Sequence, residues 1–211
     1  GSASHEFMVN CASGEDTILK CPVSGYAANV EKCEIGNRAR GTFTEAPTGE
    51  LTEVHTPHLP GIEEVGKAMG VKPARMLKSL VFKVLGPAKS GEERALPKWI
   101  IAVVRGDHDV NEGKVKILSG CQVEMAPENE ARSAGFAIGY VSPRAVNLVP
   151  ECVLLIDADA SQGGFWATGA DKIDYHVKHF NWGREVGTVL SDTTKVIVGD
   201  VRNAMEGDPS P

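Results

Sequence analysis

The pattern of hydrophobic and polar residues first becomes regular just after residue 60. Ile62, Val65 and Met69 recur at i, i+3 and i+7, which places them on one side of a short amphipathic helix. Gly70 follows the last of these residues and is suited to end the helix. The pattern therefore predicts a helix that begins near Ile62 and ends at Gly70.

The residues from 78 to 85 alternate as a strand does, with one charged residue in an apolar row. On a period of two, Lys78 shares a face with Leu80, Phe82 and Val84. A lysine in this position either extends its ammonium to water along apolar surface or faces a ligand with oxygen acceptors. Periodicity alone leaves both interpretations of Lys78 open.

Later hydrophobic runs predict further strands at 99–104, 153–156 and 175–180, the last being the final strand of the core. The run 99–104 is apolar on both faces, so both faces should be covered. Asn111 can cap a helix to about residue 118, and Pro127 is placed to begin another through about residue 134. Helices interleaved with strands predict a mixed α/β fold in which helices cover the sheet.

The N-terminal part of the chain lacks this regularity. Residues 1–60 contain only short apolar runs, and Gly, Pro and Thr interrupt residues 40–60, so this part is interpreted as a connector. A polar turn is expected at 86–93, and a glycine-rich segment at 162–170 can serve either turns or close approach of backbone amides to a ligand.

Composition and charge narrow the class of protein. A chain of 211 residues with 42% hydrophobic and 24% charged residues can bury a full core, and no apolar run reaches the roughly 18 residues that span a bilayer. The net charge of -6 argues against a broad electrostatic surface for nucleic acid, although residues 61–85 carry a local excess of positive charge. The first ten residues lack the pattern of a secretory signal.

The five cysteines are widely spaced and never form a C-x-x-C pair. Neither a zinc site nor a disulfide framework is therefore expected, and a reducing cytoplasm is the simplest setting. The sequence also contains no G-x-S-x-G elbow, no Walker A loop and no H-E-x-x-H motif. The common signatures of nucleophilic, nucleotide and zinc chemistry are missing.

A few polar residues remain as candidates for chemistry. The run Asp107, His108 and Asp109 contains metal-ligand types, but neighbours in sequence diverge, which favours a turn and cap. Asp157 ends an apolar strand, where it either presents a functional group or caps the next loop. His176 lies in a predicted strand, where a lone histidine is more often structural.

Several short motifs, taken in order and spacing, resemble the insertion domain of bacterial-type prolyl-tRNA synthetase. This domain belongs with the free-standing YbaK-type and alanyl-specific tRNA(Pro) deacylases. The resemblance implies a YbaK-like mixed β-sheet or barrel covered by helices. The motifs that carry it are residues 1–7, 13–16, 26–32, 105–108, 199–203 and 207–211.

The resemblance also implies an organisation and a function. Residues 1–50 correspond to a flanking segment from the aminoacylation domain and connector, 51–190 to the editing domain, and 191–211 to a segment that returns to the aminoacylation domain. The chain thus looks like an excised insertion without ligase activity, whose partners are the rest of the synthetase and the 3′ acceptor end of tRNA(Pro) carrying alanine. The implied activity is hydrolysis of that mischarged ester, without metal or cofactor.

The family's pocket residues can be carried over to this sequence. The resemblance places the family lysine on Lys78 as the catalytic anchor of the terminal phosphate or ribose. We hypothesise that loop amides near Gly139 and Gly169 stabilise the oxyanion. Because no side chain is an obvious general base, the substrate's own ribose hydroxyl is expected to orient the water. His179 is a weaker match than His176 for the family histidine. The full set of substrate-binding positions is Ile62, Val65, Lys78, Gly139, Asp157, Gly169 and His176.

Two departures from the family pattern bear on the substrate. The loop of residues 135–143 is closer to the G-x-x-S-P loop of the free-standing deacylases, and Val65 stands where a leucine is usual. A pocket larger by about one methylene brings cysteine within range, because one methylene contributes only about 1 to 3 kcal/mol of discrimination. A Cys-tRNA(Pro) deacylase and a non-catalytic module that binds tRNA or stabilises the synthetase remain as alternatives.

Overall fold

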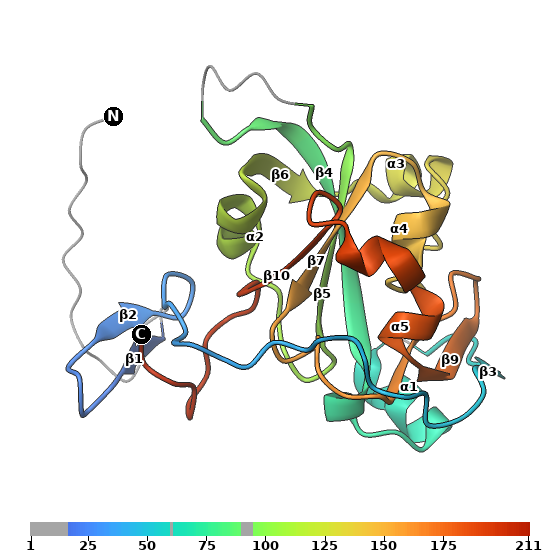
Figure 1. Cartoon of the computed structure of the whole chain (residues 1–211), viewed down its shortest axis with the longest axis horizontal. Helices are drawn as coiled ribbons and strands as arrows, with labels where there is room; N and C mark the ends of the chain where they lie inside the picture. Colours follow the sequence, from blue (N-terminus) through green and yellow to red (C-terminus); the bar gives the residue numbers. More distant parts are fainter. Residues whose placement is uncertain (1–16, 60, 90–94) are drawn as a thin grey trace.

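The computed structural model describes residues 17–59, 61–89 and 95–211 (Figure 1). The motifs at 1–7 and 13–16 lie outside the described residues, as do residues 90–93 of the predicted turn. Within the described part, strands and helices alternate along the chain, and the expected mixed α/β fold is confirmed.

The largest sheet has five strands, and its connections make it mixed. In the order of the sheet these are β10 (Val196–Gly199), β7 (Cys152–Asp157), β5 (Trp99–Arg105), β4 (Leu77–Pro87) and β6 (Cys121–Met125). The first three strands are parallel, whereas β4 is antiparallel to both of its neighbours. The predicted strand at 78–85 is thus confirmed, with a residue more at its start and two more at its end.

Helices cover both faces of this sheet, which explains why β5 is apolar on both faces. Figure 1 shows α2 (Glu112–Ser119) on one face and α3 (Glu128–Ser133), α4 (Ala145–Leu148) and α5 (Trp182–Glu185) on the other. Alternate residues of β5 belong to two separate apolar clusters, one with residues of α3 to α5 and one with residues of α2. As predicted, Asn111 caps α2 by accepting a hydrogen bond from the Lys114 N–H, and α3 follows Pro127.

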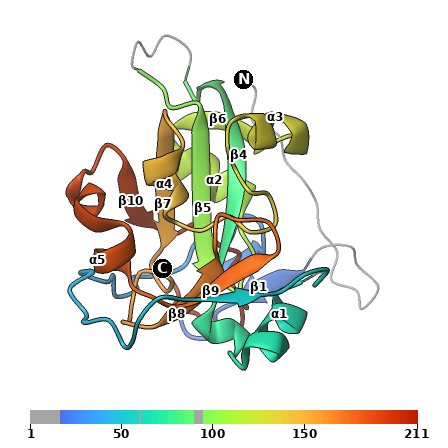
Figure 2. The ribbon, with the colours of Figure 1, turned by 90° about the vertical axis from the view of Figure 1, so that its right-hand side faces the viewer.

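A second, three-stranded sheet packs beside the first half of β4, which β6 does not reach (Figure 2). Its order is β3 (Thr52–His55), β9 (Tyr175–Phe180) and β8 (Trp166–Gly169), all antiparallel. A parallel bridge between Met76 and Ala167 joins β8 to the start of β4. The two sheets therefore meet at residues next to Lys78.

One expectation about the strands was wrong, and one strand was not expected. The strand at 175–180 is not the last of the core, because it belongs to the smaller sheet and β10 follows it in the large one. The glycine-rich segment 162–170, in which no strand was predicted, contains β8. Both β8 and β10 have only four residues, too few to establish a period in the sequence.

The N-terminal part is largely irregular, as expected, but it contains a small hairpin. Strands β1 (Ile18–Lys20) and β2 (Ala27–Asn29) pair with each other and lie beside the C-terminal tail (Figure 1). The Gly36 N–H donates to the Pro209 carbonyl at 2.7 Å. In the described residues no helix has the length and apolar character needed to cross a bilayer.

Candidate functional site

A cleft of about 700 Å³ opens where the two sheets meet. Its walls come from α1 (Ile62–Met69), the first half of β4, the loop after α3, and the ends of β8 and β9. Six of the seven residues expected at the substrate site line it. These are Ile62, Val65, Lys78, Gly139, Gly169 and His176.

Helix α1 supplies the apolar wall of the cleft. It ends as predicted, because Gly70 adopts a left-handed φ of 64° and its N–H bonds the carbonyls of the last turn. Val65 is 4% exposed and packs in an apolar cluster with Met69 and Met76, while Ile62 lies at its edge. The helix therefore presents Ile62 and Val65 to the cleft while its other apolar residues fix it to the sheets.

Lys78 lies at the mouth of the cleft near the start of β4. Its Nζ donates to Asp109 Oδ1 at 2.8 Å, and the side chains are 27% and 80% exposed. Because Asp109 is so exposed, its attraction for Lys78 is weak and easily exchanged for another anion. The ammonium of Lys78 is thus held near the cleft by a solvent-exposed ion pair and not by a buried one.

His176 lines the cleft from the start of β9, where it is the second residue. Its Nδ1 lies 2.7 Å from Thr56 Oγ1, and its ring packs edge to face with that of Tyr140, with centroids 5.4 Å apart. Burial lowers the pKa of His176 to about 4. The imidazole is therefore neutral near pH 7, so it is a hydrogen-bonding wall and not a cation.

The pKa of His176 gives a pH-dependent stability that can be measured. Unfolded histidine takes up a proton below about pH 6.5, whereas folded His176 does so only near pH 4, so acidification through this window favours unfolding. We expect the unfolding free energy of the wild type, relative to His176→Gln, to fall by on the order of 3 kcal/mol between pH 7.5 and 4. Urea denaturation of both proteins measures this difference, and a constant difference across that range would contradict a buried neutral His176.

The loop of residues 138–141 lines the cleft, and close backbone contacts hold it in place. Gly139 has a left-handed φ of 91°, and a Cβ on Gly169 would lie 2.1 Å from the Tyr140 carbonyl oxygen, so only glycine permits this approach. Asp171 accepts hydrogen bonds from the N–H and hydroxyl of Ser142, and burial raises its pKa. The loop is therefore fixed against β8 and not free to open.

Asp157 does not join this cleft, contrary to the expectation from the family resemblance. It is fully buried at the end of β7, where Arg38 binds both of its oxygens, at 2.8 and 3.1 Å. Its Oδ1 also accepts the Asp159 N–H and its Oδ2 the Val201 N–H. The second interpretation of the sequence, that this aspartate caps the following loop, describes its position in the structure.

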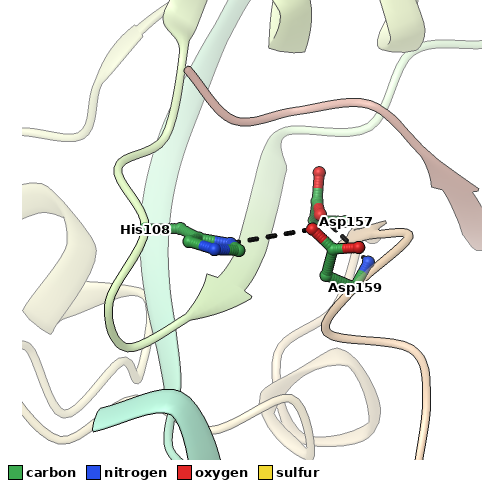
Figure 3. Close-up of side chains that lie close together, drawn as sticks. All are labelled: His108, Asp157 and Asp159. Carbon is green, nitrogen blue, oxygen red and sulfur yellow. Dashed lines mark hydrogen bonds and ion pairs between the residues drawn. The ribbon is translucent and has the colours of Figure 1, made fainter. Parts of the chain in front are cut away.

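The carboxylates of Asp157 and Asp159 lie close to His108 at the end of the large sheet (Figure 3). Residue types that can bind a metal meet here. However, Arg38 and Arg202 already bind Oδ2 of Asp159, at 2.6 and 2.9 Å. Burial opposes ionisation of Asp159, yet the two guanidinium groups hold its pKa below the usual value. Two neighbouring cations disfavour a metal ion, so we describe this cluster as an ion-pair network.

The run 107–109 also separates as expected for neighbours in sequence. Asp107 binds Arg105, His108 faces the ion-pair network, and Asp109 reaches Lys78. The three side chains do not converge on one point.

Three polar residues of the site were not expected from the sequence. Thr56 holds His176, Tyr140 packs on it, and Ser79 lines the cleft beside Lys78. Tyr140 lies inside the loop that the sequence already singled out, whereas Thr56 is about 120 positions from its partner. No local pattern could have indicated that contact.

Comparison with known proteins identifies the family of the chain. The chain belongs to the aminoacyl-tRNA editing domain family, whose model matches residues 56–186. The resemblance inferred from the sequence motifs is thereby confirmed. Among solved structures, a candidate trans-editing enzyme for prolyl-tRNA synthetase has the same fold, with a TM-score of 0.53, 20% identity, and coverage of 73% of this chain and 87% of that one.

Proline–tRNA ligases match most or all of the chain. That of Geobacter metallireducens is 38% identical over 216 residues, which covers 100% of this chain and 33% of the relative. That of Dehalococcoides mccartyi is 36% identical over 186 residues, which covers 88% of this chain and 30% of the relative. The chain thus spans about a third of the length of these relatives.

Proposed function

We propose that the chain is an editing module that hydrolyses the ester of alanine mischarged onto tRNA(Pro). The observation that carries the proposal is the cleft, which joins a cation, a neutral histidine and a small apolar wall where the two sheets meet. Its partners are then the 3′ acceptor end of tRNA(Pro) and, in the cytoplasm, the remainder of a proline–tRNA ligase. Residues 51–190 would form the editing unit, with 1–50 and 191–211 as its connections.

The chemistry requires no nucleophile from the protein. Water adds to the ester carbonyl, the bond from that carbon to the ribose oxygen breaks, and the ribose oxygen takes a proton. Lys78 would bind the terminal phosphate or ribose oxygens in exchange for Asp109, whose 2.8 Å contact is exposed to solvent. The backbone at Gly139 would stabilise the oxyanion, and the free ribose hydroxyl would orient the water.

The specificity would come from the size of the cavity. A site built for proline cannot strongly reject the smaller alanine, so a second, smaller pocket is needed to remove the error. Ile62, Val65 and His176, which all line the cleft, would exclude larger side chains. Val65, shorter than leucine, is the feature that keeps Cys-tRNA(Pro) as a second candidate substrate.

We expect removal of wall atoms to broaden the substrate range before it abolishes hydrolysis. Val65→Ala or His176→Ala should raise hydrolysis of Cys- or Pro-tRNA(Pro) relative to Ala-tRNA(Pro), by a factor corresponding to about 1 to 3 kcal/mol. The measurement is the ratio of single-turnover rates for the three esters.

A matched control keeps the interpretation of these variants clear. Val115→Ala removes the same two methyl groups from a fully buried valine on the far side of the sheet, so it tests the effect of lost stability alone. If Val65→Ala and His176→Ala slowed all three esters equally, as Val115→Ala would by destabilisation, these residues would not act as a sieve.

A further inference from the structure

Strand β4 has a gap in its hydrogen-bonded pairing on the side that faces the cleft. On that side, β6 pairs only as far as Phe82, and the Ala126 N–H donates to the Val81 carbonyl at 3.0 Å. At the other end of the gap, Thr168 Oγ1 donates to the Leu77 carbonyl at 3.3 Å. Ser79 lies between these two bonds and lines the cleft.

The backbone of Ser79 points into this gap. The Met76 carbonyl accepts from Gly106, and the Val84 N–H donates to Lys98, so even-numbered residues of β4 direct their polar groups towards β5. Odd-numbered residues face the opposite way, as the bonds at Leu77 and Val81 show. Because these directions alternate along a strand, the N–H and C=O of Ser79 face the cleft.

The gap therefore offers one donor and one acceptor, both from the same residue. In an antiparallel sheet, such a residue pairs with one residue that returns a carbonyl and an N–H. The Ser79 hydroxyl is also buried without a hydrogen-bond partner among the described residues. Buried polar groups without partners are unusual, and this hydroxyl belongs to the same residue whose backbone faces the cleft.

We propose that the aminoacyl group of the substrate fills this missing position in the sheet. Its ester carbonyl accepts from the Ser79 N–H, and its α-ammonium donates to the Ser79 carbonyl. The substrate is then recognised by its backbone through β4 and by its side chain through the cavity wall, and the tRNA end approaches Lys78 one residue away. This inference rests on the proposed editing function and adds how the reacting ester is held.

The arrangement has a physical advantage for an editing site. Recognition through the backbone is common to all α-amino acids, so it positions the ester without contributing to the choice of side chain. The Ser79 N–H also donates to the carbonyl oxygen that becomes negative in the reaction, where a fixed donor is most effective.

The α-ammonium contact can be tested with the unmodified chain. Propionyl-tRNA(Pro) has the alanyl group without its nitrogen. We expect the acceleration over spontaneous hydrolysis to be at least tenfold smaller for propionyl-tRNA(Pro) than for Ala-tRNA(Pro). Equal accelerations would overturn the inference and leave the editing function intact, whereas no acceleration of Ala-tRNA(Pro) would overturn the editing function itself.

The N–H contact can be tested by exchanging one atom of the backbone. Incorporation of lactic acid at position 79 replaces the N–H by an ester oxygen, and the matched reference is Ser79→Ala with its ordinary amide. We expect at least a tenfold slower deacylation of Ala-tRNA(Pro) than in Ser79→Ala, with little change in melting temperature. The same exchange at Leu80, which faces β5, should instead lower the melting temperature.

Two results would contradict the proposed role of the Ser79 N–H. One is an unchanged deacylation rate in the ester protein at position 79. The other is a loss of melting temperature at position 79 as large as that at Leu80, which would show that the Ser79 N–H is already bonded within the folded chain.

Discussion

Lys78→Ala should slow deacylation of Ala-tRNA(Pro) by at least tenfold, which corresponds to about 1.4 kcal/mol of activation free energy. The reason is that Lys78 is the cation at the mouth of the cleft, and its only observed ion-pair partner among the described residues is the exposed Asp109. Loss of such an exposed pair costs no more than about 1 kcal/mol of stability. Single-turnover deacylation, with urea denaturation to verify folding, measures both effects.

Lys83 provides a matched control on the same strand. It pairs with Glu130 at 2.6 Å and is similarly exposed, but it does not line the cleft. Lys83→Ala should therefore keep the deacylation rate within about twofold of the wild type, because a twofold change corresponds to only about 0.4 kcal/mol. A folded Lys78→Ala protein that is as active as Lys83→Ala would remove Lys78 from the mechanism.

Arg202→Met should have the largest effect on stability, a loss of about 3 to 5 kcal/mol. The Arg202 side chain is 3% exposed, and it binds Asp208 at 2.6 and 2.8 Å and Asp159 at 3.0 Å. Its removal leaves buried carboxylates without their partner, and that penalty exceeds the value of the bonds themselves. The free energy of unfolding in urea is the quantity to measure.

Arg132→Met is the control for this substitution. Arg132 forms an exposed pair with Glu128 one helical turn away, worth about 0.3 to 0.5 kcal/mol. If Arg202→Met cost no more than Arg132→Met, the ion-pair network would not be what attaches the C-terminal tail to the large sheet.

The parts of the fold that the sequence predicted are those with a clear period or a clear end. Helix α1 was predicted from three apolar positions and the glycine that ends it, and β5 from a run that is apolar on both faces. The short strands β8 and β10 escaped prediction because four residues carry too little pattern. Their positions are decided by pairing with distant strands.

The candidate site, like the fold, was predicted only in part. Resemblance to a family placed six residues that line one cleft, although their positions range from 62 to 176 along the sequence. It misplaced Asp157, because the strand that this residue ends faces the N-terminal connection and the tail, where Arg38 and Arg202 surround it. The direction in which a strand's end points is a property of the sheet and not of the local sequence.

The most direct test of the editing proposal is the single-turnover deacylation of Ala-, Cys- and Pro-tRNA(Pro) by the unmodified chain. If the cleft excludes by size, Ala-tRNA(Pro) should be hydrolysed fastest and Pro-tRNA(Pro) no faster than in buffer alone. Faster hydrolysis of Cys-tRNA(Pro) than of Ala-tRNA(Pro) would show that Cys-tRNA(Pro) is the preferred substrate. Binding of tRNA(Pro) without acceleration of any of the three esters would contradict the account.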